Sequence, residues 1–379
     1  MARIAVFYHP EYDSYDFGMN HPLKPWRWKL TFDLMSSMGL FNSGSAEATE
    51  PFKATRGDLL LFHKENYVRH VKKLSDEGFG LLDQGDTTAF PRCYDVARIF
   101  VGASMMAVDY VMGGQGSAAF NIGGGFHHAY PDRAAGFCIF NDVGVAISHL
   151  KKRYGVRKLL YVDIDAHHGD GVMYSYYSDA GVLDIDFHES GQFLFPGTGF
   201  VHEVGDKDGR WHKVNVPLLP HTTDTVFLQL FREIVEPLAK SYKPEVILLQ
   251  CGVDAHFGDQ LAHLSLTTQA YIEVANIMME LAEQLCNGRL VLFGGGGYNT
   301  AAVSKCWTLM VSALSGRRLA EPIPIKWLDD FEKFEHLRPS DNLEDVEPIT
   351  SNAEVVHAER AALEILSQIR DRIFPNFSF

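Results

Sequence analysis

The stretch from Lys158 to Val172 constrains the fold most, because an apolar run there passes within a few residues into a dense set of acids and histidines. Side chains two apart on an extended strand point to the same side. Asp163, Asp165 and His167 therefore share one face if residues 159–165 are extended. A strand that ends in this way presents a metal site.

Composition narrows the class of protein. The 379 residues are 46% hydrophobic, which allows a large buried core. The formal net charge of -14 argues against nucleic acid or an anionic membrane as a partner and favours cationic substrates. The N-terminal apolar run ends at His9 and is too short for a signal segment or a membrane span. The cysteines are widely spaced and include no CxxC pair, which predicts reduced thiols in a cytoplasmic protein: Cys93, Cys138, Cys251, Cys286 and Cys306.

Short apolar runs alternate with segments of helical spacing along the chain. We expect strands in the first ten residues and at 117–121, 158–164, 182–187, 246–251 and 290–293. Helices are expected at 94–112, 142–154, 223–240, 267–286 and 353–372. This alternation predicts an α/β protein with a mostly parallel sheet. We expect residues 1–379 to form a single domain, with a motif-bearing core over about 1–316 and a C-terminal wrap over 317–379.

Four of the expected strands are followed by reactive residues. These are His127 and His128, the cluster at 163–170, Asp254 and Tyr298. Taken alone, a buried histidine or aspartate is more often a satisfied core or capping residue. Ligand sites of open parallel sheets, however, lie beyond the carboxyl ends of the strands. The joint occurrence therefore favours one shared site.

The residue types at these strand ends point to metal-assisted hydrolysis of an amide. Asp165, His167 and Asp254 would form an open site of one histidine and two carboxylates, as expected of a catalytic zinc. Zinc lowers the pKa of bound water to about 7. Alternation turns His168 away from the metal face, so we expect it to make a structural hydrogen bond.

Other polar groups of the set would move or stabilise charge. His127 and His128 would share proton transfer, and Asp163 and Asp170 would each orient one imidazole. Tyr298 would donate to a developing oxyanion. A nucleophile, a proton shuttle and an oxyanion donor are then all present.

Six motifs contain or flank these positions: GGGFHHA (123–129), GFCIFND (136–142), YVDIDAHHGDGV (161–172), FPGTG (195–199), QCGVD (250–254) and GGGGY (294–298). Together they closely resemble the zinc-dependent histone deacetylase family, including its bacterial and archaeal acetoin-utilisation-type members. The resemblance runs in order from about His21 to about Gly316. It implies the arginase/deacetylase fold, a central eight-stranded, mostly parallel sheet flanked by helices. It also implies removal of an acyl group from a lysine-like amine.

The resemblance assigns roles to the residues of these motifs. Asp165, His167 and Asp254 match the zinc ligands, with Fe²⁺ as the alternative metal in the cell. His128 matches the family's general base and acid, and Asp170 matches the carboxylate that partners it. His127 matches a histidine that acts mainly by electrostatics, and Asp163 matches its carboxylate partner. Tyr298 matches the residue that polarises the acyl carbonyl.

Further matches concern the substrate. Gly136, Phe137 and Phe195 match a narrow channel that sandwiches the lysine methylenes. Asp86 matches a rim aspartate that holds the substrate backbone. Arg27 matches an arginine lining an acetate-release channel, whereas the sequence pattern alone favours a solvated surface arginine.

The resemblance also implies a potassium site beside the zinc. That site would use the carbonyl groups of Asp165, His167 and Phe187 with the side chain of Asp163. Asp186 stands where the family commonly has a serine. The extra carboxylate would either strengthen cation binding or alter it.

Three rival functions use the same residues differently. A binuclear manganese ureohydrolase needs carboxylates where this chain has Gly169 and His256, which argues for one metal. A deacetylase of acetylpolyamines or other small acetylated amines shares every catalytic group and differs at the pocket mouth. An inactive acyl-lysine-binding module is disfavoured because all the catalytic residues are present. The expected partner is an acyl-lysine peptide or protein, or a small acetylated amine.

Overall fold

Eight parallel strands form one sheet in the computed structural model, which describes residues 3–42, 44–319, 322–345 and 352–378. The strand order is β2-β1-β3-β8-β7-β4-β5-β6. The strands are β1 (Ile4–Phe7), β2 (Ala46–Thr49), β3 (Ala118–Asn121), β4 (Leu159–Asp163), β5 (Val182–Glu189), β6 (Lys213–Leu218), β7 (Val246–Gln250) and β8 (Leu290–Phe293). The predicted α/β fold with a central parallel sheet is confirmed.

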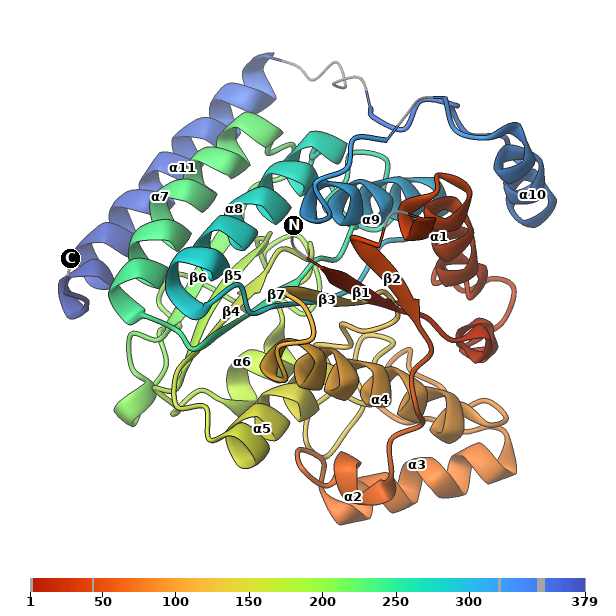
Figure 1. Ribbon diagram of the computed structural model, residues 1–379. Helices are drawn as coiled ribbons and strands as arrows, with labels where there is room; N and C mark the ends of the chain where they lie inside the picture. Colours follow the sequence, from red (N-terminus) through yellow and green to blue (C-terminus); the bar gives the residue numbers. More distant parts are fainter. Residues whose placement is uncertain (1–2, 43, 320–321, 346–351, 379) are drawn as a thin grey trace.

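Helices cover both faces of this sheet (Figure 1). One side carries α1 (Trp26–Ser37), α7 (Asp224–Tyr242), α8 (Thr268–Cys286) and α9 (Thr300–Leu314), with α10 (Ile325–Glu335) and α11 (Asn352–Arg372) outside them. The other side carries α2 (Arg56–Leu59), α3 (Glu65–Glu77), α4 (Cys93–Met112), α5 (Asp142–Tyr154) and α6 (Asp170–Ser175). No helix in these described ranges is long and apolar enough to cross a membrane.

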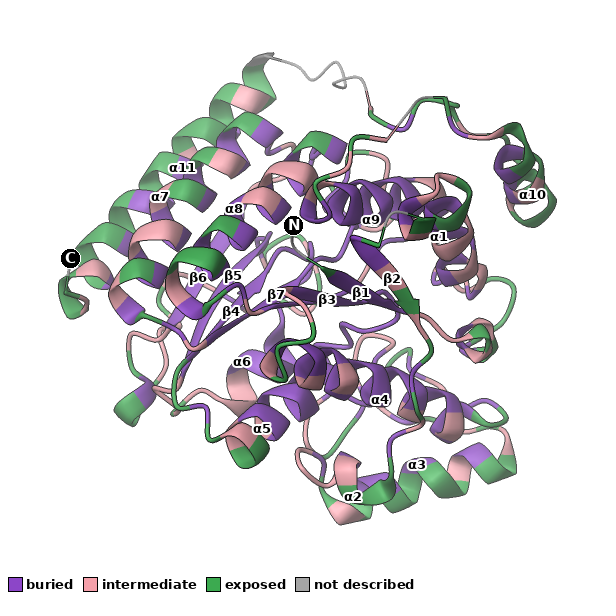
Figure 2. Ribbon diagram, viewed as in Figure 1, coloured by how far each residue is buried: buried purple, intermediate pink, exposed green. Residues whose placement is uncertain are grey.

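The inner strands are buried along their whole length (Figure 2). A parallel sheet covered on both faces needs continuous apolar runs rather than alternating ones. The runs LLYVD in β4 and VILLQ in β7 have this character. This is why apolar runs in the sequence located the inner strands.

The two edge strands, β2 and β6, were not located by the sequence pattern. The sequence of β2 is AEAT, which is too short and too polar to form the apolar run that predicts a buried strand. The sequence of β6, KVNVPL, includes Pro217, which is tolerated on a sheet edge because that position need not donate to a neighbour. Each of these edge strands pairs with the backbone N–H and C=O groups of the neighbouring strand. That stabilisation comes from the tertiary structure and is not visible in the local sequence.

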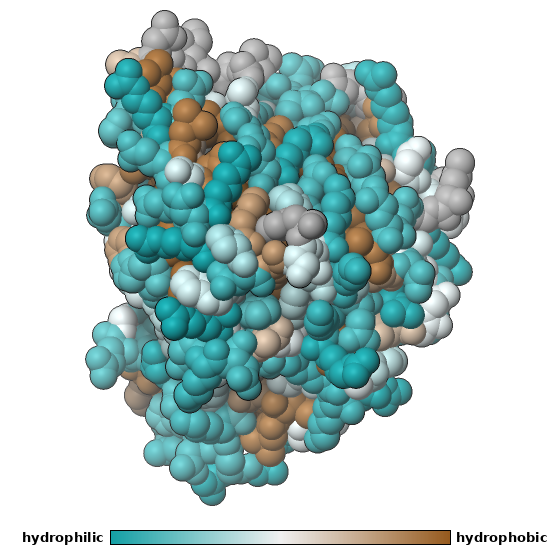
Figure 3. All heavy atoms as spheres, turned by 90° about the vertical axis from the view of Figure 1, so that its left-hand side faces the viewer, coloured by the Kyte–Doolittle hydropathy of each residue, from teal (hydrophilic) through white to brown (hydrophobic). Residues whose placement is uncertain are grey.

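The C-terminal helix α11 lies where the sequence predicts a helix, and it packs against α7 and β6. Its buried side chains are Ala358, Ala362, Ile365, Leu366 and Ile369. The face of the molecule that carries α11 is mostly hydrophilic, with scattered apolar groups (Figure 3). Within the predicted wrap 317–379, residues 320–321, 346–351 and 379 lie outside the described part, and the single-domain organisation stays a prediction.

All the cysteines are buried and free: Cys93, Cys138, Cys251, Cys286 and Cys306. A buried free cysteine behaves as a small apolar side chain. These thiols therefore belong to the core.

Candidate active site

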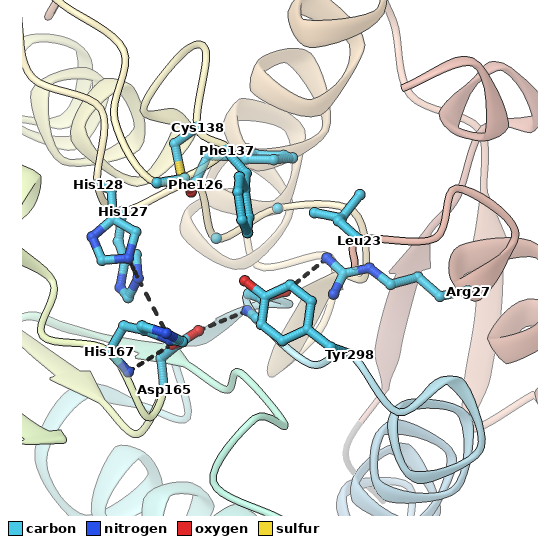
Figure 4. Close-up of a pocket in the computed structure, with 15 residues that line it drawn as sticks. Leu23, Arg27, Phe126, His127, His128, Phe137, Cys138, Asp165, His167 and Tyr298 are labelled. Atoms are coloured by element: carbon cyan, nitrogen blue, oxygen red, sulfur yellow. Dashed lines mark hydrogen bonds and ion pairs between the residues drawn. The ribbon is translucent and has the colours of Figure 1, made fainter. Parts of the chain in front are cut away.

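The strands that precede the reactive residues are neighbours in the sheet. β3, β8, β7 and β4 lie side by side in that order. Their carboxyl ends bring five of the expected residues into or beside one pocket, namely His127, His128, Asp165, His167 and Tyr298 (Figure 4). The pocket has a volume of about 20 Å³, enough for a water molecule. The expected convergence is thus present in the structure.

Asp165, His167 and Asp254 form a buried group whose ligand atoms all lie within 4.8 Å of one another. The Nδ1 atom of His167 is 2.8 Å from Oδ2 of Asp254 and 3.3 Å from Oδ1 of Asp165. A side chain at Gly296 would overlap Asp254, since a Cβ there would lie 2.0 Å from its Oδ2. The glycine run after β8 therefore lets the carboxylates approach the backbone.

The electrostatics of this group favour a bound cation. Burial and the charge of Asp165 raise the pKa of Asp254 to about 7. Burial opposes a charge on His167, but its bonds to Asp165 and Asp254 outweigh that effect and raise its pKa well above the ordinary value. Two buried carboxylates thus compete for one positive charge. A divalent ion would satisfy both, and the donor set fits zinc.

The two histidines of the GGGFHHA motif lie beside this group, each held by a carboxylate. Nδ1 of His127 is 2.8 Å from Asp163 Oδ2, and Nδ1 of His128 is 2.7 Å from Asp170 Oδ1. Their Nε2 atoms are 3.2 Å apart. Burial and the charge of His127 lower the pKa of His128, so its imidazole is neutral near pH 7. A neutral imidazole can accept a proton.

The loop that carries these histidines is fixed by the N-terminus of α5. Asn141 caps the helix through Gly144 N and also donates from Nδ2 to the carbonyl oxygens of His127 and Ala129. The carboxylate of Asp142 accepts from the backbone N–H groups of residues 125 and 126. Sequence reasoning did not single out Asn141 or Asp142, although both lie in the GFCIFND motif.

Tyr298 stands on the opposite side of the pocket and points its ring toward the metal-capable group (Figure 4). Its ring packs edge-on against His167 and Phe137, with centroid separations of 6.3 Å and 6.0 Å. Burial raises the pKa of its hydroxyl well above the ordinary value. The phenol therefore keeps its proton and can donate a hydrogen bond.

Gly136 lines both the inner pocket and a wider hollow outside it, and so marks the entrance to these groups. The Phe195 ring packs edge-on against His128 at 5.1 Å, and it is 48% exposed. Phe137 lines the pocket next to Tyr298. Gly136 has a φ of 50°, and a Cβ there would lie 2.4 Å from the His128 ring. Only glycine fits between His128 and the entrance.

Asp86 lies at the mouth outside this entrance. It borders a wider hollow of about 720 Å³ that also touches Gly136 and Phe195. Its Oδ1 accepts a hydrogen bond from the Thr87 hydroxyl at 3.4 Å. Burial and the neighbouring Asp83 raise the pKa of Asp86. The structure thus places it at the rim but not in the inner pocket.

The expectation of a solvated Arg27 from sequence pattern alone is wrong. Its side chain is only 2% exposed and lines the inner pocket. Its guanidinium donates to the carbonyl oxygens of Gly295 and Gly297, each at 2.8 Å, and lies over the ring of Trp28 at 4.8 Å. The pattern failed because the acceptors are main-chain carbonyls from a distant loop. Arg27 gives the deep end of the pocket a positive charge.

The remaining residues that the sequence analysis discussed lie outside the inner pocket. Asp186 and Phe187 lie on β5, and Asp186 is opposite Asp163 in the register of β4 and β5. His168 makes the expected structural hydrogen bond, with 2.8 Å between Nδ1 and the Thr198 hydroxyl. His256 pairs with Asp345 at 2.8 Å and so offers no second metal ligand.

Sequence reasoning also missed two residues that hold Tyr298. Asp259 accepts from the backbone N–H of Tyr298, and Gln260 donates to its carbonyl oxygen. Both belong to a loop after β7 that has no periodic pattern. The Gly-Asp pair at 258–259 marks a turn, but nothing in the sequence indicates which backbone that turn contacts.

Comparison with known proteins supports one family. Residues 21–314 match the histone deacetylase domain. The chain is 38% identical over 341 residues to the acetoin utilization protein AcuC of Bacillus subtilis (strain 168), covering 87% of each chain. It is 36% identical over 344 residues to AcuC of Staphylococcus aureus (strain MRSA252), covering 88% of this chain and 87% of that relative. AcuC of Staphylococcus xylosus is also 36% identical, over 86% of each chain.

Proposed function

Because the chain belongs to the histone deacetylase family, we propose that it is a zinc-dependent hydrolase that removes the acyl group from an acylated lysine side chain. The observation that carries the proposal is the meeting of the Asp165, His167 and Asp254 group with the His127–His128 pair at one pocket. Family membership supports a deacetylase. The metal, the substrate and the residue roles are our proposal.

Asp165, His167 and Asp254 would hold the metal, with Zn²⁺ preferred and Fe²⁺ as the alternative in the cell. Their close approach and the raised pKa of Asp254 support this assignment. The ion, when bound, would act as a Lewis acid that activates water and polarises the acyl carbonyl. The protein contributes the position of the substrate and the movement of protons.

His128 would take the proton of the attacking water at Nε2 and return it to the leaving amine. Asp170 holds its Nδ1–H and so fixes the tautomer that leaves Nε2 free to accept. His127, held by Asp163, would stabilise the charge that develops beside it. The Tyr298 hydroxyl would donate to the acyl oxygen as that oxygen gains charge.

The shape of the entrance supports a chain-like substrate. Gly136, Phe137 and Phe195 would enclose the methylenes of the lysine, and Asp86 would hold the substrate backbone at the rim. The mouth widens to a hollow of about 720 Å³, which leaves room for the flanks of a peptide. The positive charge of Arg27 would attract the acetate product into the deep end of the pocket.

A comparison of substrates tests this proposal. Zinc-loaded protein is given an acetyl-lysine peptide, an acetylated polyamine and a small acetyl amide, and released acetate is measured. We expect the highest kcat/KM for the peptide, and Tyr298→Phe serves as the impaired control. A higher kcat/KM for the acetylated polyamine would assign the enzyme to small amines instead. No acetate release from any of the three would reject the deacetylase.

A further inference from the structure

The carboxylate of Asp170 has a second partner, to which the proposed reaction gives no role. Its Oδ1 lies 2.7 Å from Nδ1 of His128, and its Oδ2 accepts a hydrogen bond from the hydroxyl of Tyr130 at 2.9 Å. Asp170 is only 5% exposed, so solvent cannot freely replace either partner. One oxygen of this carboxylate therefore serves the imidazole, and the other serves the phenol.

The charges of the two groups suit this contact. Burial alone would raise the pKa of Asp170, but its bonds with His128 and Tyr130 hold that pKa below the ordinary value, so the group stays a carboxylate. Burial and the charge of Asp170 raise the pKa of the Tyr130 hydroxyl, so the phenol keeps its proton and donates. A donor on Oδ2 restrains rotation of the carboxylate and so keeps Oδ1 beside the imidazole. Two residues then hold the tautomer that carries a hydrogen on Nδ1.

The backbone of Tyr130 is fixed on both sides of its side chain. Its N–H donates to the carbonyl oxygen of Arg133 at 2.9 Å, and its own carbonyl oxygen accepts from Nδ1 of His63 at 3.1 Å. His63 accepts in turn from the backbone N–H of Asn141, which caps α5 and holds the loop of the two histidines. Tyr130 therefore belongs to the same hydrogen-bonded framework as those histidines.

The Tyr130 ring is also held from one face. The guanidinium carbon of Arg133 lies 3.5 Å from the ring centroid, which is a cation–π contact. Arg133 borders the hollow at the mouth, as Gly136 does. A ring held in this way has little freedom to turn its hydroxyl away from Asp170. The contacts thus run without a break from the mouth through Arg133 and Tyr130 to the catalytic pair.

We propose that Tyr130 is a further positioning residue of this site, one that holds the Asp170 carboxylate so that His128 presents its Nε2 to the attacking water. The inference rests on the proposed role of His128 in proton transfer. Tyr130 lines neither the inner pocket nor the hollow at the mouth. Its hydroxyl should therefore affect kcat and leave KM unchanged.

The chain offers a matched control away from the pocket. The carboxylate of Asp109 accepts from the hydroxyl of Tyr154 and lies beside Nε2 of His149, with 2.7 Å for each contact. Histidine, aspartate and tyrosine thus meet there as they do at Asp170, and both tyrosines are half-buried. Tyr154→Phe removes the same kind of hydrogen bond as Tyr130→Phe without touching the site.

The first test is steady-state kinetics of these two variants, loaded with zinc, on an acetyl-lysine peptide. Tyr130→Phe keeps the ring beneath Arg133 and loses only the hydroxyl. We expect its kcat to fall about tenfold, with unchanged KM and zinc content, because a less firmly held group is less often in the productive geometry. Tyr154→Phe should match wild type. A wild-type kcat in Tyr130→Phe overturns the proposal, and so does an effect on KM alone.

The second test needs no turnover, and it follows the Nδ1 proton of His128 by NMR in zinc-loaded, substrate-free protein. The signal is assigned by its loss in His128→Gln. We expect it to be lost to faster exchange with water in Tyr130→Phe and to persist in Tyr154→Phe. An unchanged signal in Tyr130→Phe overturns the proposal. If wild type releases no acetate but the signal is lost in Tyr130→Phe alone, the deacetylase assignment fails and the positioning of His128 by Tyr130 stands.

Discussion

The carboxylate of Asp259 accepts a hydrogen bond from the backbone N–H of Tyr298, with 2.7 Å between the two atoms. The neighbouring Gln260 donates to the carbonyl oxygen of Tyr298 at 3.2 Å. The two peptide groups that flank the Tyr298 side chain are thus held by one loop. This loop therefore sets the direction of the phenol.

Loss of the hydrogen bond between the Tyr298 N–H and Asp259 should slow the reaction without removing the metal. We expect Asp259→Ala to lower kcat about tenfold or more, because a small displacement of a catalytic group is costly, while the zinc content stays the same. Asp259→Asn keeps an oxygen acceptor and should retain more activity than the alanine variant. Steady-state kinetics and metal analysis check both. An unchanged kcat in Asp259→Ala would show that this hydrogen bond is not needed to position Tyr298.

The hydroxyl of Tyr298 should act on the transition state. Tyr298→Phe is expected to lower kcat by about 10²-fold with little change in KM, because the lost hydrogen bond matters most when charge develops on the acyl oxygen. The ring contacts with His167 and Phe137 remain in this variant. Kinetics on an acetyl-lysine peptide provide the measurement. A variant that raises KM alone would assign Tyr298 to substrate binding.

His63 should make the fold sensitive to acid. Burial lowers the pKa of His63 to about 3, and its Nε2 accepts a hydrogen bond from Asn141 N. In the unfolded chain the group titrates near about 6.5, so between these values the unfolded state binds more protons. This contribution is complete above the unfolded pKa and is lost as the pH falls toward the folded pKa. At about pH 5 the loss is about 2 kcal/mol.

The measurement for His63 is urea unfolding at several pH values. From about pH 7 to about pH 5, the free energy of unfolding should fall less in His63→Gln than in wild type, by about 2 kcal/mol. The difference between the two proteins cancels the other titrating groups. If the free energy of unfolding falls equally with pH in the two proteins, His63 is not the source of the acid sensitivity.

A linear hydroxamate should inhibit the enzyme. Its chain would occupy the proposed lysine channel at Phe137 and Phe195, and its two oxygens would chelate a zinc ion held by the ligand group. The matched carboxamide has the same chain without the chelating pair and should inhibit far less. Inhibition constants for the two compounds provide the comparison. Indifference to the hydroxamate at high concentration would count against a zinc amidohydrolase.

The sequence predicted those features that depend on local pattern. Apolar runs located the inner strands, and reactive residues after β3, β4, β7 and β8 indicated a shared site, because parallel strands end at the same edge. Features that depend on distant partners could not be predicted in this way. The burial of Arg27 depends on carbonyls of residues 295 and 297, and the role of Asp259 depends on a backbone contact across two loops.

The central claim is that Asp165, His167 and Asp254 hold one catalytic metal ion, and a zinc titration tests it most directly. Metal-stripped protein is refilled in steps, and acetate release from an acetyl-lysine peptide is measured at each step beside Asp254→Ala. We predict no release from the stripped protein, a linear rise up to one zinc per chain, and neither zinc binding nor release in the variant. Full acetate release by metal-free protein would contradict the account.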